Sequence, residues 1–174
     1  MSRLAEIIKE SKLDPRWVEL EITEHSIMKD PEQAIEKLLE LKNMGMRIAI
    51  DDFGTGYSSL SYLKRFPIDT LKVDQSFVRD VCADPADAAI VRAIVTLAHS
   101  LDLRVVAEGV ETPEQLEHLT SLGCDVVQGF IFSRSISTAS FQELLEEQRQ
   151  VGSRRGPATT RLANFTARLQ PIKV

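Results

Sequence analysis

The chain has 174 residues, of which 43% are hydrophobic and 27% are charged, and this composition excludes a disordered or fibrous protein. Its 26 acidic and 21 basic residues give a formal net charge of -5, so the overall charge gives no reason to expect a nucleic-acid polymer as a partner. No apolar run reaches the ~20 residues that a bilayer-spanning helix needs, and the first residues lack the pattern of a signal peptide. We therefore expect a cytoplasmic protein without a membrane segment.

Short apolar runs alternate with longer amphipathic stretches along the chain. After an initial amphipathic helix at residues 3–12, the apolar runs predict strands at residues 18–22, 47–50, 70–73, 104–107 and 126–130. Amphipathic periodicity predicts the later helices at residues 31–44, 86–101, 113–122 and 139–148. Repeated strand and helix units with nearly continuous apolar strands are typical of an α/β fold with a buried parallel sheet.

The five predicted strands are fewer than the eight of a closed (β/α)8 barrel, which usually takes ~250 residues. We therefore expect a partial barrel that lacks about three strands at its amino-terminal end. A sheet of this kind has unpaired edges, which favour a homodimer or a partner that completes the sheet. The expected domain covers residues 1–148, and residues 149–174, which are poor in apolar side chains, are expected to form a mobile tail.

Acidic residues lie at or just after the carboxyl ends of four predicted strands. In chain order these residues are Glu21 and Glu24, Asp51 and Asp52, Asp74, and Glu108 and Glu111. Because the carboxyl ends of parallel strands meet at one rim, we expect these side chains to converge there. Each residue alone is equally consistent with a helix N-cap or a solvated side chain. The adjacent carboxylates Asp51 and Asp52 would repel each other without a compensating cation, so the pattern favours a metal site.

Carboxylate ligands without histidine or thiolate partners select hard cations, here Mg²⁺ or Mn²⁺. Two such ions bridged by one aspartate would suit hydrolysis of a phosphodiester. Lys72, close to the same rim, has the charge to orient an attacking water or to neutralise phosphate. The alternative for Lys72 is an ordinary lysine solvated at the rim.

Two further segments are candidates for shaping this site. Gly54 and Gly56 follow the aspartate pair, ahead of a short helix, and predict a mobile loop beside the site. Gln128, followed by Gly129, offers an amide for a nucleobase edge or a phosphate, with an ordinary buried amide as an equal alternative. Trp17 is interpreted as a core anchor or a contact at the barrel rim.

Five motifs in chain order resemble the motif series of the EAL-domain family of cyclic-di-GMP phosphodiesterases. They span Glu21 to Glu24, Asp51 to Leu60, Leu71 to Asp74, Ala107 to Thr112, and Gln128 to Ser133. The resemblance implies a TIM-like barrel in a bacterial second-messenger pathway. It also implies hydrolysis of cyclic-di-GMP to the linear dinucleotide pGpG with two Mg²⁺ or Mn²⁺ ions.

The resemblance also implies roles for individual residues around the two ions. The implied metal ligands, of which Asp51 bridges both ions, are Glu21, Asp51, Asp52 and Glu108. Lys72 would lie beside the catalytic water, and Glu111 would position that water. Glu108 is therefore a candidate for both metal binding and catalysis.

The remaining implied roles concern the loop and the ligand pocket. Glu24 would brace the loop that contains Gly54 and Gly56, which in the family couples the site to dimerisation. Gln128, with Gly129, would line the pocket for cyclic-di-GMP.

The chain departs from the family pattern at its front. It contains neither the Glu-Ala-Leu signature nor the later strand-end asparagine, which would each supply a ligand to one ion. We therefore expect impaired hydrolysis by the isolated chain. One alternative is a non-catalytic module for cyclic-di-GMP binding or dimerisation. The other is a different Mg²⁺-dependent barrel that acts on a phosphorylated or carboxylated small molecule.

Overall fold

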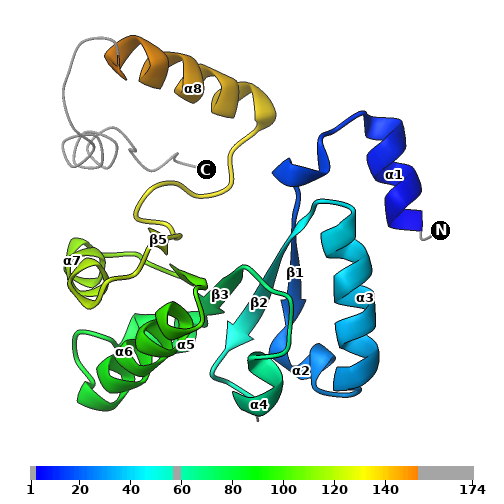
Figure 1. Cartoon of the computed structure of the whole chain (residues 1–174). Helices are drawn as coiled ribbons and strands as arrows, with labels where there is room; N and C mark the ends of the chain where they lie inside the picture. Colours follow the sequence, from blue (N-terminus) through cyan, green and yellow to red (C-terminus); the bar gives the residue numbers. More distant parts are fainter. Residues whose placement is uncertain (1–2, 57–59, 153–174) are drawn as a thin grey trace.

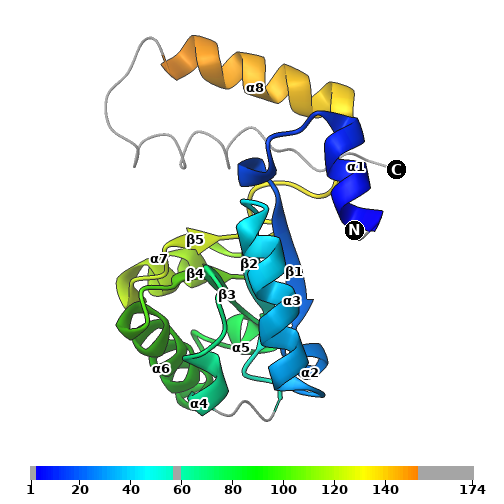
Figure 2. The same ribbon diagram turned by 45° about the vertical axis from the view of Figure 1, so that its right-hand side comes forward.

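The computed structural model describes residues 3–56 and 60–152, and within it five parallel strands form one sheet in sequence order. The strands are β1 (Glu19–Thr23), β2 (Arg47–Phe53), β3 (Thr70–Val73), β4 (Arg104–Ala107) and β5 (Val126–Val127). Figures 1 and 2 show a curved sheet with helices along its outer face. The expected α/β fold and the expected number of strands are therefore confirmed.

The longer helices agree with the amphipathic pattern to within a few residues. They are α1 (Arg3–Ser11), α3 (Pro31–Asn43), α6 (Pro85–Ser100), α7 (Pro113–Leu122) and α8 (Thr138–Gly152). The short α4 (Leu60–Leu63) follows the glycine loop as expected. Three further short elements have no predicted counterpart: η1 (Pro15–Trp17), α2 (Glu24–Ile27) and α5 (Gln75–Arg79). A single helical turn is too short to show a 3.6-residue period, which explains why the sequence pattern misses these three.

Polar caps fix where three of the long helices begin. The side chains of Asp30, Asp84 and Thr112 each accept a hydrogen bond from a backbone N–H in the first turn of α3, α6 and α7 respectively. Each cap is followed by a proline, which has no N–H to leave unpaired at that position. These side chains therefore satisfy N–H groups that have no partner within the helix.

The hydrophobic core lies between the outer face of the sheet and the helices. Successive side chains of a strand point to opposite faces, so Leu71 and Val73 of β3 pack into this core while Thr70 and Lys72 face the inside of the curve. The hydroxyl of Thr70 donates to Glu19 of β1 across the inner face, at 3.2 Å. The inner face therefore carries polar side chains that bind one another, and it positions the site described below.

Four details of the fold differ from the sequence-based predictions. β2 continues through Phe53, so that Asp51 and Asp52 are part of the strand, whereas β5 is shorter than the predicted run of residues 126–130. Trp17 is 76% exposed, so its interpretation as a core anchor is wrong. α8 extends to Gly152 and includes residues 149–152 of the predicted tail. The rest of that tail lies outside the described residues.

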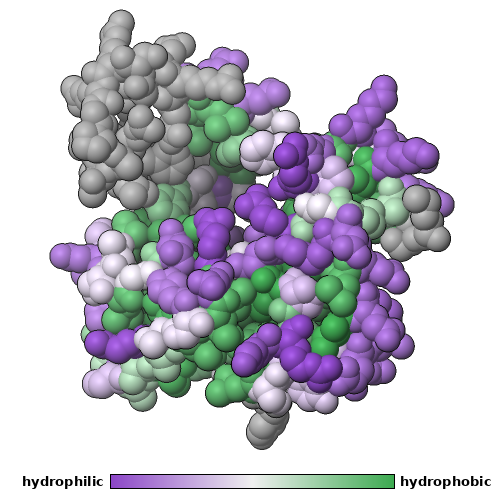
Figure 3. Space-filling model, in the orientation of Figure 1, coloured by the Kyte–Doolittle hydropathy of each residue, from purple (hydrophilic) through white to green (hydrophobic). Residues whose placement is uncertain are grey.

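Several large apolar side chains remain at the surface of the described chain. The face of the molecule in Figure 3 shows both apolar and polar surface. The exposed apolar side chains include Ile7, Leu13, Trp17, Phe130, Phe141 and Leu145. α1 and α8, which carry three of these residues, stand apart from the helices that cover the sheet (Figures 1 and 2). No helix in the described ranges is both long enough and apolar enough to cross a membrane.

Candidate metal centre

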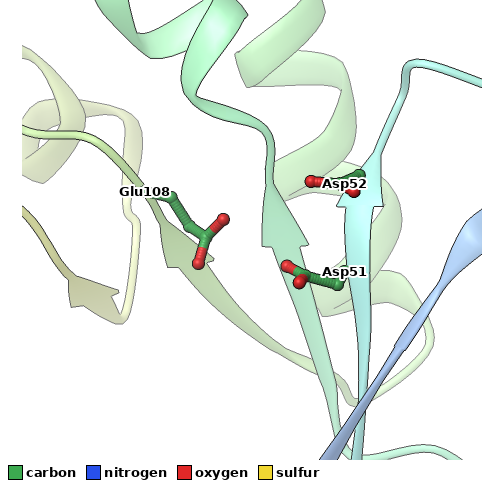
Figure 4. A group of neighbouring side chains, drawn as sticks. All are labelled: Asp51, Asp52 and Glu108. Carbon is green, nitrogen blue, oxygen red and sulfur yellow. The ribbon is translucent and has the colours of Figure 1, made fainter.

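Three carboxylates meet above the inner face of the sheet. Asp51 and Asp52 come from β2, and Glu108 directly follows β4. One oxygen of each lies within 4.8 Å of an oxygen of the other two. Figure 4 shows the three side chains directed toward a common space over β3. The rim location expected from the sequence therefore brings these three residues together.

A backbone irregularity in β2 makes this convergence of adjacent residues possible. Neighbouring side chains of a regular strand point to opposite faces. Here the pairing with β3 shifts register between Ile50 and Phe53, and Asp52 has a φ of 53°, in the left-handed region. A bulge of this kind redirects a side chain, and aspartate adopts the left-handed conformation more readily than most residues. Both carboxylates consequently lie near Glu108.

The ammonium group of Lys72 lies among carboxylates that are part of, or directly follow, three other strands. Its Nζ is 2.8 Å from Glu21, 2.9 Å from Asp51 and 2.7 Å from Glu108. Lys72 belongs to β3, which pairs with β2 on one side and β4 on the other. Its side chain is 5% exposed, so the alternative of a lysine solvated at the rim is wrong.

Burial and mutual repulsion disfavour the ionised forms of the carboxylates in the centre. Burial, together with the neighbouring carboxylates of Asp51 and Asp74, raises the pKa of Asp52. Burial also raises the pKa of Glu108, although its contact with Lys72 opposes this change. For Lys72 itself, burial lowers the pKa, but the contacts with Glu108, Glu21 and Asp51 outweigh burial and raise it overall. A bound cation would stabilise the ionised carboxylates further.

One buried oxygen of the centre suits a metal ion. Oδ1 of Asp51 is buried and has no hydrogen-bond partner among the described residues. Its contact with the ammonium group of Lys72, at 2.9 Å, is an ion pair. A buried carboxylate oxygen beside other carboxylates fits a hard cation such as Mg²⁺ or Mn²⁺. The residues present therefore fit the implied metal ions.

Asp74 has a structural partner next to this centre. Its side chain accepts a hydrogen bond from the backbone N–H of Ser76, at 2.8 Å, and caps α5. Burial by itself would raise the pKa of Asp74, but its hydrogen bonds, those with Ser76 first and those with Asp52 and Gln75 after them, outweigh burial and lower it. The structure therefore confirms the N-cap alternative for Asp74.

The structure does not bring Glu111 or Gln128 into the cluster around Lys72. Both are exposed, and neither side chain makes a contact described for the centre. The alternative of a buried amide at Gln128 is therefore wrong. The next residue, Gly129, lies so close to the backbone of Val110 that a Cβ atom at this position would overlap it. Gly129 is thus required for the close approach of two backbone segments.

Glu24 connects the end of β1 to the glycine loop. It is 1% exposed, and its Oε2 accepts a hydrogen bond from the backbone N–H of Gly54, at 2.9 Å. A Cβ atom added to Gly56 would lie 2.6 Å from Oε1 of Glu24. The close packing of Glu24 against both glycines is consistent with a brace for this loop. Residues 57–59 of the same loop lie outside the described residues.

Sequence reasoning missed Gln115, which is buried behind the Glu108–Glu111 segment. Its Oε1 accepts hydrogen bonds from the backbone N–H groups of Glu111 and Thr112, at 2.8 and 3.0 Å. Its Nε2 donates to the backbone carbonyl of Arg79 at the end of α5. The spacing of Thr112 and Gln115 forms a capping box, a signal from which this role could have been found.

A family model described as "EAL domain" matches residues 1–135. The chain belongs to the EAL domain family. Its relatives include the cyclic di-GMP phosphodiesterase NbdA of Pseudomonas aeruginosa, which is 46% identical over 142 residues. That match covers 82% of this chain but 18% of NbdA, and this EAL domain spans about a fifth of the length of the curated relatives it matches.

Solved EAL structures share the fold. The PaMucR phosphodiesterase in complex with c-di-GMP has a TM-score of 0.77 and is 46% identical, with 79% of this chain and 56% of that chain covered. Klebsiella pneumoniae BlrP1 in its manganese/cy-diGMP complex at pH 6 has a TM-score of 0.70 and is 43% identical, over 75% of this chain and 33% of that chain. The five-stranded sheet of this EAL domain is therefore part of a TIM-like barrel, as expected.

Proposed function

We propose that this EAL domain hydrolyses cyclic-di-GMP to pGpG with Mg²⁺ or Mn²⁺ bound at its carboxylate centre. The observation that carries the proposal is the convergence of Asp51, Asp52 and Glu108 beside Lys72. The name of NbdA and the c-di-GMP complex of PaMucR support the choice of substrate. The manganese complex of BlrP1 supports the choice of ion.

The carboxylates at the rim would hold the metal ions, and Lys72 would act on the phosphate. The proposed ligands are Glu21, Asp51, Asp52 and Glu108, with Asp51 shared between the two ions. When bound, such ions activate a water and stabilise the attacking and leaving oxygens of the phosphodiester. Lys72 would stabilise the negative charge that develops on the phosphate, because its ammonium is held in a buried position.

The segments around the centre would position the water and the dinucleotide. Glu111 follows Glu108 on the same loop, and we propose that its carboxylate orients the attacking water. Gln128 and Gly129 lie after β5, where the exposed amide of Gln128 is free to contact a nucleotide. Glu24 would brace the loop with Gly54 and Gly56, which its hydrogen bond to Gly54 supports. The cytoplasmic location expected from the sequence belongs to the same proposal.

The open sheet favours a second candidate function for the isolated chain. Within the described residues, β1 and β5 each pair on one side, which leaves the outer edge of each strand unpaired. An unpaired edge is a template for another strand. We therefore propose that the chain by itself hydrolyses cyclic-di-GMP slowly, and that a homodimer or a strand-completing partner restores its activity. A module for cyclic-di-GMP binding or dimerisation is the second candidate.

The test is to incubate the purified chain with cyclic-di-GMP and Mn²⁺ or Mg²⁺ and to measure pGpG by chromatography. Asp51→Asn is the matched variant, since it keeps the shape of the side chain and removes the charge. We expect slow, metal-dependent formation of pGpG by the wild-type chain and none by Asp51→Asn. Losing one group that stabilises the transition state typically slows an enzyme by ~10²–10³-fold.

Binding of cyclic-di-GMP in Ca²⁺, measured by calorimetry, separates the two candidate functions. Saturable binding by a folded chain that forms no pGpG with Mn²⁺ would favour the non-catalytic module. Equal rates for the wild-type chain and Asp51→Asn would exclude the proposed centre. Rapid hydrolysis by a monomer would contradict the proposed impairment alone.

A further inference from the structure

We propose that Lys72 is the counter-cation of the metal-free centre and that a divalent ion binds by exchange with its ammonium group. The metal ion and the ammonium group would then occupy the same carboxylates in alternate states. This inference rests on the proposed function, because the exchanging ion is the one that hydrolysis requires. It implies that Lys72 itself limits how tightly the centre binds a metal ion.

The first argument is that Lys72 and the candidate ligands use the same side chains. Of the three contacts of its Nζ, those to Asp51 and Glu108 involve two of the three carboxylates that could hold an ion together. The third contact, to Glu21, leads to a more exposed side chain on the edge strand β1. A cation placed between Asp51 and Glu108 would therefore compete directly with the ammonium group.

The second argument comes from burial and charge. The Lys72 side chain is 5% exposed, and a buried ammonium group is stable only when carboxylates or other acceptors compensate its charge. Once a divalent ion takes over Asp51 and Glu108, the ammonium loses these partners and is repelled by the ion. The long, flexible side chain of lysine allows the charge to move while the backbone of β3 stays in place. Glu21, the third contact of the ammonium group, is not one of the three carboxylates that could hold an ion together.

The order of events follows from the exchange. The ammonium contacts three carboxylates, at 2.7 to 2.9 Å. It becomes available to a phosphate group only after the ion has displaced it from Asp51 and Glu108. Metal binding would thus precede productive phosphate binding.

The test is a calorimetric titration of the 174-residue chain with Mn²⁺, compared between the wild type and Lys72→Met. Methionine keeps the length of the side chain and removes the competing charge. We expect Lys72→Met to bind Mn²⁺ at least about tenfold more tightly than the wild type, since the ion no longer displaces a cation. Without Mn²⁺ the variant should melt at a lower temperature, because its carboxylates repel one another, and Mn²⁺ should reverse this loss.

Lys42→Met is the matched control. Lys42 pairs with both carboxylate oxygens of Asp69, at 2.6 and 2.7 Å, and Asp69 lies just before β3, at the opposite end of the sheet from the candidate centre. Removing this charge should change the affinity for Mn²⁺ by less than about twofold, because the charge is distant and screened.

A structure of the wild-type chain with Mn²⁺ gives a second measurement that does not depend on the folding of a variant. We expect Nζ of Lys72 to move beyond the ~4 Å limit of an ion pair from both Asp51 and Glu108. The exchange is overturned if both ion pairs persist beside a bound ion, if Lys72→Met binds Mn²⁺ no more tightly, or if neither protein binds Mn²⁺. Exchange without any pGpG would reject the proposed hydrolysis alone, and hydrolysis without exchange would reject this inference alone.

Discussion

Single buried polar side chains hold the segments around the candidate centre in place. Gln115 is the clearest case, because its amide satisfies two backbone N–H groups and one carbonyl from different parts of the chain. Glu24 has a similar position on the other side of the centre, where it accepts a hydrogen bond from Gly54. Neither residue belongs to the three-carboxylate group. At the residue scale, both hold backbone segments that lie near the centre.

We predict that Gln115→Leu lowers the free energy of unfolding by about 2–3 kcal/mol, because it leaves the backbone N–H groups of Glu111 and Thr112 without an acceptor. Chemical denaturation measures this loss. Gln33→Leu, on the exposed face of α3, is the matched control and should change the free energy of unfolding by less than ~0.5 kcal/mol. Equal losses in the two variants would contradict the bridging role of Gln115.

We also predict that Gly56→Ala destabilises the chain by about 1–3 kcal/mol through overpacking. The added Cβ would lie 2.6 Å from Oε1 of Glu24, whose buried side chain has little space to move. In a Glu24→Ala background the same substitution should cost much less, since the clash is gone. A double-mutant cycle of thermal unfolding measures this coupling. An unchanged cost in that background would place the strain elsewhere in the loop.

At the scale of elements, Asp125 connects α6, β4 and the start of β5. Its Oδ2 accepts a hydrogen bond from the backbone N–H of Val105, at 2.8 Å, and lies 3.0 Å from Nε2 of His99. Burial alone would raise the pKa of Asp125, but the hydrogen bonds from His99 and Val105 outweigh burial and lower it below 3.8. The ionised carboxylate therefore stabilises the packing of α6 against the strands.

The sign of this shift predicts a pH dependence of stability. Because the pKa of Asp125 is lower in the folded state, the unfolded chain binds more protons in acid, and the stabilisation is lost as the pH falls through the folded pKa. Thermal melts should show a stability advantage of the wild type over Asp125→Asn at about pH 5 that shrinks toward about pH 2. Asp102→Asn, at an exposed turn before β4, is the control. A difference independent of pH would contradict the electrostatic explanation.

At the scale of the whole molecule, the open sheet and the exposed apolar side chains favour association. Trp17 is the only tryptophan, is 76% exposed, and lies two residues before β1, whose outer edge is unpaired in the described chain. Apolar surface of this kind is typical of a region that another polypeptide covers. The exposed residues of α1 and α8 have the same character.

We predict that the chain self-associates as its concentration rises and that Trp17 becomes buried in the process. Sedimentation velocity should show an increase in mass, and the fluorescence emission should shift to shorter wavelength over the same concentration range. Both changes should persist in high salt, since apolar contacts and strand pairing do not depend on surface charge. A monomer with unchanged emission across the range would contradict this prediction.

Much of the fold could be predicted from local patterns. Continuous apolar runs such as residues 47–50 marked the strands, and Asp30 before Pro31 marked a helix start, because both signals depend on neighbouring residues alone. The one-turn helices α2 and α5 could not be predicted, since they follow strands directly and are too short for a period. Trp17 could not be placed, because burial depends on which elements come together.

The sequence by itself determined the order of strands and helices, the parallel sheet and the rim on which Asp51, Asp52, Lys72 and Glu108 lie. These features follow from local periodicity and from the rule that strand ends of a parallel sheet share one edge. Tertiary structure alone decided the bulge that turns Asp51 and Asp52 to the same side and the pairing of Lys72 with three carboxylates. It also decided the bridge made by Gln115. Each of these depends on distances between residues that are far apart in the chain or on a backbone angle that residue type permits but does not impose.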